Sequence, residues 1–248
     1  MSTSERRHAM YFTSETSADG LVEREFTVGE VPGVLWTPFA GPGPLVLLGH
    51  GGGNHKKHPA MTGRGGLLVA AGFSVAVLDA PGHGDRPRSA DDDREIAVMQ
   101  EAMATGEPVG PIVERYNGDL AARAVPEWQA ALDALQDEVP GPVGYWGINM
   151  GTAIGVPLIA VEPRIKAAAL GQFWPSTLVD LAKRITIPIE FAVQWDDEHI
   201  PREDALALFD AFASPEKTLH ANAGKHKQLP RFEAASAVRF FSRHLGTP

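Results

Sequence analysis

Side chains that can do acid–base or acyl chemistry follow three apolar runs of this sequence, each at the point where a run ends. Asn149 follows "PVGYWGI". The neighbouring carboxylates Asp196 and Asp197 follow "IPIEFAV", and His226 follows "KTLHANAG". A carboxylate that orients a histidine can make that histidine a general base for a reacting group. The residue at 149 is a neutral amide, which is not among the side chains that attack readily.

The stretch "GYWGINMGTAIG" has the pattern of a sharp turn between a strand and a helix. Gly147 and Gly151 flank Asn149, one substitution away from the G-x-S-x-G turn that presents a serine nucleophile. Glycine suits this turn because the backbone is strained and neighbouring backbone passes close by. The N-terminus of the following helix offers N–H groups to developing negative charge. Alone, the pattern also fits an incidental glycine-rich turn.

A second glycine-rich loop, "HGGGNHKKHP", spans 50–59 and follows another apolar run. The nucleophile-bearing turn between strand and helix is called the elbow. In hydrolases with an elbow, one backbone N–H of this loop and the N–H of the residue after the nucleophile bind the oxyanion of a tetrahedral intermediate. We assign these donors to Gly52 and Met150. We place Gly51 and Gly53 in the pocket wall beside them.

The histidines of this loop, His50, His55 and His58, raise the alternative of a metal site. No matching carboxylate pattern accompanies them, so we expect no metal. The loop also lacks the G-K-(S/T) ending of a phosphate loop, and no nucleotide-binding fingerprint occurs elsewhere. The sequence therefore predicts a site without a cofactor.

Continuous apolar runs alternate with segments of helical periodicity along most of the chain. Such runs are typical of strands covered on both faces, as in a parallel sheet. Residues 21–28 and 31–39 instead alternate apolar and polar, which predicts antiparallel strands. The pattern predicts an α/β fold with a mostly parallel, doubly wound sheet. The parallel strands are predicted at 45–50, 73–79, 142–148, 166–173, 187–193 and 217–224, and helices at 122–139, 201–212 and 230–245.

Length and composition limit the class of protein. The 248 residues are 44% hydrophobic with a net charge of −9, which suits a single soluble domain over 1–248 and disfavours nucleic acid as a partner. The absence of cysteine excludes disulfides and thiolate chemistry. Without a signal-like start or an apolar run of ~20 residues, we expect a cytoplasmic protein that does not engage a membrane. Residues 1–20 are polar and expected to be flexible.

Together these motifs resemble the α/β-hydrolase superfamily, in its dienelactone-hydrolase-like and small esterase-like branch without a large cap. The resemblance runs from about Val34 to the C-terminus and rests on "LVLLGHGGG", "VLDAPGHGDR", "GYWGINMG", "DDEHIP" and "AGKHKQLP". It implies a carboxylic-ester, lactone or thioester hydrolase that works by acyl transfer. The family pattern D-x-x-(V/I)-P selects Asp197 over Asp196 as the acid, and G-x-H selects His226 as the base. The chain departs from the family at the nucleophile, where Asn149 stands.

Four interpretations of Asn149 remain open. The first, preferred because the other motifs are complete, is an engineered replacement of Ser that disables a hydrolase. The second is a natural lyase, isomerase or cyclase in which His226 with Asp197 acts as general base without a covalent nucleophile. The third is a non-catalytic ligand-binding protein on a hydrolase fold. The fourth, deamidation of Asn149 to an Asp nucleophile, is least favoured because the chain lacks room for the cap of such enzymes.

The pocket is expected at the C-terminal ends of the parallel strands. We place Trp174 and Trp195 in its wall, although either could equally pack in the core. Part of 85–120 is expected either to shape the substrate site or to form a solvated helix with loops. Aromatic walls favour a small ester-like substrate with an apolar or aromatic group. An exposed antiparallel edge near the N-terminus could pair two copies as a homodimer.

Overall fold

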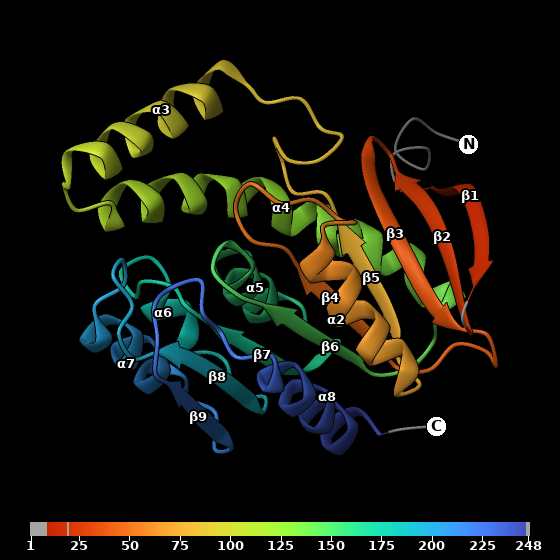
Figure 1. Cartoon of the computed structure of the whole chain (residues 1–248). Coiled ribbons are helices and arrows are strands. Elements are labelled where there is room, and N and C mark those ends of the chain that lie inside the picture. Colours follow the sequence, from red (N-terminus) through yellow and green to blue (C-terminus); the bar gives the residue numbers. More distant parts are fainter. Residues whose placement is uncertain (1–8, 19, 247–248) are drawn as a thin grey trace.

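A mixed β-sheet forms the centre of the computed structural model, which describes residues 9–18 and 20–246 (Figure 1). The strands are β1 (Met10–Ala18), β2 (Leu21–Val28), β3 (Val31–Pro38), β4 (Leu45–Gly49), β5 (Ser74–Leu78), β6 (Val143–Gly147), β7 (Ile165–Gly171), β8 (Ile189–Gln194) and β9 (Lys217–Asn222). In this part of the chain they form one sheet in the order β1-β2-β3-β5-β4-β6-β7-β8-β9. The pairings from β1 to β5 are antiparallel, and those from β5 through β4 to β9 are parallel.

Helices cover both faces of this sheet. They are α2 (Pro59–Ala70), α3 (Ala90–Thr105), α4 (Gly110–Glu138), α5 (Met150–Val161), α6 (Val179–Ala182), α7 (Arg202–Ala211) and α8 (Phe232–Leu245). Helices α2 and α8 cover one face, and α4, α5 and α7 cover the other (Figure 1). Their buried apolar side chains belong to two core clusters, one on each face. The predicted α/β class, a mostly parallel sheet after N-terminal antiparallel strands, is confirmed. No helix in the described ranges combines the length and apolarity needed to cross a bilayer.

The long connection between β5 and β6 holds a pair of helices that the sequence pattern defines only in part. The predicted helix 122–139 is the second half of α4, which begins at Gly110 and continues through Pro126. The preceding helix, α3, begins with a capping box in which Ser89 and Asp92 bond each other's backbone N–H groups. Acidic residues in its first turn suit the positive end of the helix dipole. Figure 1 shows α3 lying beside the first half of α4, beyond the edge of the sheet.

The expectation of flexibility over 1–20 is wrong for Met10–Ala18, which form β1. This strand pairs with β2 along its whole length, with one register shift between Phe12 and Ser14. The guanidinium of Arg24 lies 4.2 Å from the centre of the Phe12 ring. Most β1 side chains are exposed, so no apolar alternation marks the strand in the sequence. Residues 1–8 and 19 lie outside the described residues, and pairing of two copies along β1 stays a prediction.

The turn between β6 and α5 depends on close backbone contact with β4. A Cβ at Gly151 would lie 2.5 Å from the carbonyl oxygen of Gly49, and one at Gly147 would lie 2.5 Å from the carbonyl oxygen of Gly151. The buried Tyr145 hydroxyl donates a 2.6 Å hydrogen bond to the carbonyl of Gly151. Only glycine allows this approach, which seats the first turn of α5 against the centre of the sheet.

We expect Gly151→Ala to lower the free energy of unfolding by roughly 1–3 kcal/mol, because the added methyl must displace backbone rather than a mobile side chain. Urea unfolding measures the loss. Gly66→Ala is the matched control, because Gly66 also lies in a helix but has open space around the added Cβ. That control should raise stability by about 0.4–1 kcal/mol. Equal effects at the two positions would contradict the proposed backbone contact.

Candidate active site

The backbone of Asn149 adopts a conformation that few residues other than glycine take. Its φ is 62° and its ψ is −121°, and α5 begins at the next residue. Its N–H donates to the carbonyl of Gly171 at the end of β7, at 3.0 Å. The same carbonyl accepts the hydroxyl of Thr152 at 2.6 Å, which fastens the first turn of α5 to the sheet. A strained residue held by its surroundings is a feature of functional sites.

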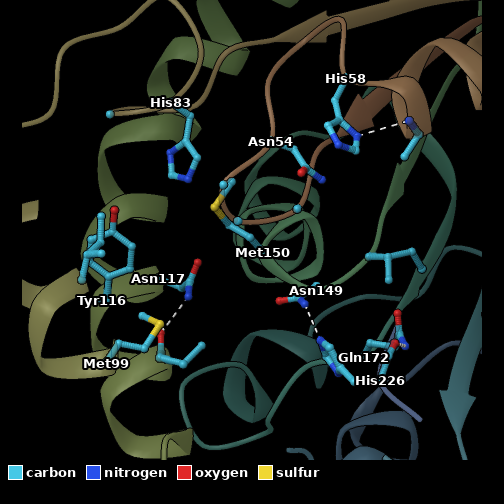
Figure 2. A pocket seen from close by; sticks show the side chains of 18 of the residues that line it. Asn54, His58, His83, Met99, Tyr116, Asn117, Asn149, Met150, Gln172 and His226 are labelled. Atoms are coloured by element: carbon cyan, nitrogen blue, oxygen red, sulfur yellow. Dashed lines mark hydrogen bonds between the residues drawn. The ribbon is translucent and has the colours of Figure 1, made fainter. Parts of the chain in front are cut away.

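The side-chain amide of Asn149 forms a hydrogen bond with one ring nitrogen of His226, and Asp197 binds the other. Nδ2 of Asn149 lies 2.6 Å from Nε2 of His226 (Figure 2). Nδ1 of His226 lies 2.7 Å from Oδ2 of Asp197. A carboxylate can only accept, so the proton of the neutral ring belongs on Nδ1. Nε2 is then a free acceptor, and the amide N–H of Asn149 donates to it. The amide therefore makes the hydrogen bond that a serine hydroxyl would make to a catalytic histidine.

Asp197 is fixed on both carboxylate oxygens. Oδ1 accepts the backbone N–H groups of His199 and Ile200 at 2.9 and 3.0 Å, which leaves Oδ2 for His226. Burial raises the pKa of Asp197, but the hydrogen bonds from His226 and from the two backbone N–H groups outweigh it and hold the pKa below its usual range. The carboxylate is therefore charged at neutral pH and can stabilise an imidazolium.

Two side chains hold the loop that carries His226. The backbone N–H of His226 donates to Glu198 at 2.9 Å, and its carbonyl accepts Nε2 of Gln172 at 2.6 Å. Gln172 is buried and, like Asn149, has a positive φ, here 54°. Because Gln172 directly follows Gly171, which accepts the N–H of Asn149, the elbow and the histidine loop share one anchor at the end of β7.

The loop after β4 is tied to the turn after β5 by two buried side chains. Nε2 of His50 accepts the N–H of Ala80 at 3.0 Å, so Nδ1 carries the proton and donates to the carbonyl of Gly51 at 2.9 Å. Asp79 accepts the backbone N–H and the ammonium of Lys56 at 2.7 and 3.1 Å. Burial lowers the pKa of His50 to about 4, so the ring is neutral at pH 7. These contacts fix the loop that includes Gly52.

A cleft of about 1210 Å³ joins these parts. It is lined by Asn149, His226 and the loop after β4, and its outer wall comes from α3 and the first half of α4 (Figure 2). Much of that wall is apolar, with Ile96, Met99 and Met103 from α3. The helix pair of 85–120 therefore borders the same space as the elbow.

No group of three or more His, Asp or Glu side chains within the described ranges is arranged to hold a metal ion. The loop histidines have other contacts: His50 bonds backbone groups, and His58 caps α2 by accepting the N–H of Ala60 at 3.2 Å. The ring of His55 packs at a right angle to that of His58, with centroids 6.0 Å apart.

No protein-family model and no curated protein matches the chain. Among solved structures, it is similar to a cold-adapted esterase from an Arctic intertidal metagenomic library. The polyethylene-glycol-bound complex of that esterase is 34% identical, with a TM-score of 0.76 over 94% of this chain and 98% of that chain. The chain belongs to the α/β-hydrolase esterases.

Two more distant structures agree in fold with this α/β-hydrolase. An acetyl xylan esterase from Paenibacillus sp. R4 is 16% identical, with a TM-score of 0.65 over 96% of this chain and 88% of that chain. TT1662 from Thermus thermophilus is also 16% identical, with a TM-score of 0.72 over 92% of this chain and 99% of that chain. At this identity the likeness shows the fold alone.

The structure brings most of the residues singled out in the sequence to the hydrolase cleft. Gly51, Gly52, Gly53, Met150 and Trp174 line it together with Asn149 and His226. Asp197 reaches it through His226. Its neighbour Asp196 instead accepts the N–H of Gly224 at 3.3 Å and faces Arg202, which explains why only one of the two acids meets the base.

Trp195 does not line the cleft, contrary to expectation. Its side chain is 38% exposed, and the guanidinium of Arg202 stacks 4.0 Å from its ring centre. The carbonyl of Trp195 also accepts Nη2 of Arg202 at 2.8 Å. Position beside the acid in the sequence was a poor guide, because successive side chains after a strand point in different directions.

Three residues of the hydrolase site were not found from the sequence: Gln172, Glu198 and Lys56. Gln172 has a positive φ, and its hydrogen-bond partner is 54 positions away, so no local sequence pattern identifies it. Glu198 lies inside the quoted "DDEHIP" motif, but its partner is a backbone N–H 28 positions away. Lys56 lies in the quoted glycine-rich loop, but its partners Asp79 and Asp85 are 23 and 29 positions away.

The shift at His50 gives the hydrolase a testable pH dependence. The folded-state pKa, about 4, lies below the ordinary 6.5 of an unfolded chain. Stability from this group is therefore complete above pH 6.5 and is lost as the pH falls towards 4. When the pH falls from 7 to 4.5, we expect the free energy of unfolding to decrease by roughly 2 kcal/mol because of His50. Urea unfolding at both pH values measures this loss.

His50→Gln should reduce that pH-dependent loss by about the same amount. His55→Gln, at an exposed position in the same loop, should leave the loss unchanged. A loss that is the same in all three proteins would show that His50 is not the titrating group.

Proposed function

We propose that this chain carries the acyl-transfer site of a carboxylic-ester hydrolase in which Asn149 fills the position of a serine nucleophile and prevents acylation. The observation that carries the proposal is the place of Asn149. Its backbone has the strained conformation of an elbow, and its Nδ2 lies 2.6 Å from Nε2 of His226. Asp197, on the far nitrogen of the same ring, completes the acid–base pair.

With a serine at 149, each group has a defined part in the reaction. The hydroxyl oxygen attacks the ester carbonyl while Nε2 of His226 takes its proton, and Asp197 stabilises the imidazolium. The N–H groups of Gly52 and Met150 bind the oxyanion, the second of them at the N-terminus of α5. Collapse of the intermediate expels the alcohol, which receives the proton from His226. Water, activated by the same histidine, then releases the acid.

Asn149 keeps the hydrogen bond to His226 but not the reactivity. The lone pair of the amide nitrogen is delocalised, so Nδ2 donates a proton without being able to attack a carbonyl. Removing the nucleophile of such a triad costs on the order of a million-fold in rate, and some residual rate comes from the remaining site. The chain as it stands therefore binds an ester with little or no turnover.

The walls of the cleft support an ester with an apolar portion. Trp174 is almost completely buried at the cleft, and Ile96, Met99 and Met103 of α3 face the same space. Large apolar side chains around a few polar groups are typical of sites for small organic ligands. An acyl or alcohol group packed against α3 would lose its water shell beside the elbow.

We expect Asn149→Ser to raise hydrolysis of p-nitrophenyl acetate and butyrate by at least about a thousand-fold over the unsubstituted chain. Release of p-nitrophenol measures the rate. His226→Ala added to Asn149→Ser should abolish the gain, because the hydroxyl then has no base. Intact mass after a short incubation should show an acyl group on the Asn149→Ser protein and none on the unsubstituted chain.

The other interpretations of Asn149 predict different results. A non-covalent lyase, isomerase or cyclase would keep its own turnover in the unsubstituted chain, lose it in His226→Ala and gain nothing from Asn149→Ser. A binding protein would show no turnover in the unsubstituted chain, in His226→Ala or in Asn149→Ser. No ester hydrolysis by Asn149→Ser across several acyl lengths would overturn the acyl-transfer proposal.

A further inference from the structure

Arg64 places an unpaired positive charge in the wall of the cleft. It lies on α2, one helical turn after the loop that includes Gly52, and it is partly buried. Among the residues that the structure describes, none forms an ion pair or hydrogen bond with its guanidinium, which lies over the face of Trp146, 5.1 Å from the ring centre. Burial lowers the pKa of Arg64 to about 10, so the group remains charged at neutral pH.

The rest of the cleft offers Arg64 no negative charge. None of the residues that line it, all within the described part of the chain, is Asp or Glu, although the whole chain has a net charge of −9. Two further arginines at the cleft have acidic partners: Arg86 forms a bidentate pair with Glu127, and Nε of Arg88 lies 3.4 Å from the exposed carboxylate of Asp93. The cleft is thus a cationic space in an acidic protein.

A guanidinium that is partly withdrawn from water and has no counter-ion is less stable than one in bulk solvent. The face of Trp146 offsets part of this cost by a cation–π contact, but an aromatic ring cannot accept the in-plane N–H groups. Those N–H groups form a planar fork that matches the two oxygens of a carboxylate. A carboxylate in the cleft would supply the missing partner.

We propose that Arg64 is an anion-binding subsite and that the ester bound in this cleft carries a free carboxylate. Arg64, Asn149 and His226 line one continuous space, so one ligand can place its ester carbonyl at the elbow and its carboxylate at α2. The ligand class is a half-ester of a dicarboxylic acid, with its short apolar chain between the two groups. This specificity rests on the proposed esterase function.

The first test uses binding to the unsubstituted chain, which needs no turnover. Isothermal titration with monomethyl succinate and dimethyl succinate compares two esters that differ in one carboxylate. We expect the half-ester to bind roughly 10- to 100-fold more tightly, and Arg64→Gln to remove that preference. Arg64→Lys, which keeps the charge without the planar fork, should retain part of it. Arg239→Gln, which removes an exposed charge on α8 away from the cleft, should retain all of it.

The second test uses turnover in the Asn149→Ser background, with p-nitrophenyl hemisuccinate and p-nitrophenyl butyrate as substrates. We expect Arg64→Gln to lower kcat/KM for the hemisuccinate by about tenfold or more, mainly through KM, and to leave the butyrate unchanged. Thermal unfolding of Arg64→Gln should be unchanged or shifted upwards, because a partly buried charge without a counter-ion is removed.

The outcomes separate the two proposals. Suppose that the Asn149→Ser protein hydrolyses the butyrate ester, but Arg64→Gln changes neither the preference for monomethyl over dimethyl succinate nor that for the hemisuccinate over the butyrate. The anion subsite is then overturned and the esterase proposal stands. If Arg64→Gln lowers the melting temperature without changing the preference between the succinates, Arg64 only supports Trp146 and the subsite is overturned. If the Asn149→Ser protein hydrolyses neither ester, the esterase proposal fails, and the titration on the unsubstituted chain still decides the subsite.

Discussion

The site depends on how closely three stretches of backbone can approach one another. The elbow after β6 is possible because Gly147 and Gly151 carry no side chain where the first turn of α5 meets the carbonyl of Gly49 on β4. That contact sets the height of α5 above the sheet and the direction of residue 149. It also places the N-terminus of α5 at the cleft, where Met150 is the one residue of the first turn, within the described chain, whose N–H does not donate to a backbone carbonyl.

The other parts of the site are fastened to this centre by hydrogen bonds that cross long stretches of sequence. The end of β7 holds the backbone of Asn149 through Gly171 and the histidine loop through Gln172. On the other side, neutral His50 and the buried carboxyl group of Asp79 join the loop after β4 to the turn after β5. The side chains of Gln172, His50 and Asp79 are buried, so each of their hydrogen bonds also satisfies a group that would be costly to leave unpaired.

Asn149 shows that the geometry of such a site and its chemistry are separable. The amide donates to Nε2 of His226 as a hydroxyl would, so the imidazole, Asp197 and the cleft keep their arrangement without a nucleophile. The difference lies in the electrons of one atom, since a delocalised amide nitrogen can donate a proton but cannot attack a carbonyl. Under the proposed function, such a pocket captures intact esters, and the proposed anion subsite at Arg64 selects among them.

The sequence by itself determined the α/β class, the order of the parallel strands along the chain, and the candidates Asn149 and His226, because apolar runs and glycine spacings are local properties. It could not separate Asp197 from Asp196 without a family pattern, and it misplaced Trp195, because side-chain direction after a strand is set by the turn. It overlooked β1, whose side chains are exposed on both faces and are held by pairing with β2. Only the tertiary structure decided that α3 borders the cleft, that Gln172 anchors the histidine loop, and that Arg64 has no counter-ion among the described residues, because each depends on contacts between residues far apart in the chain.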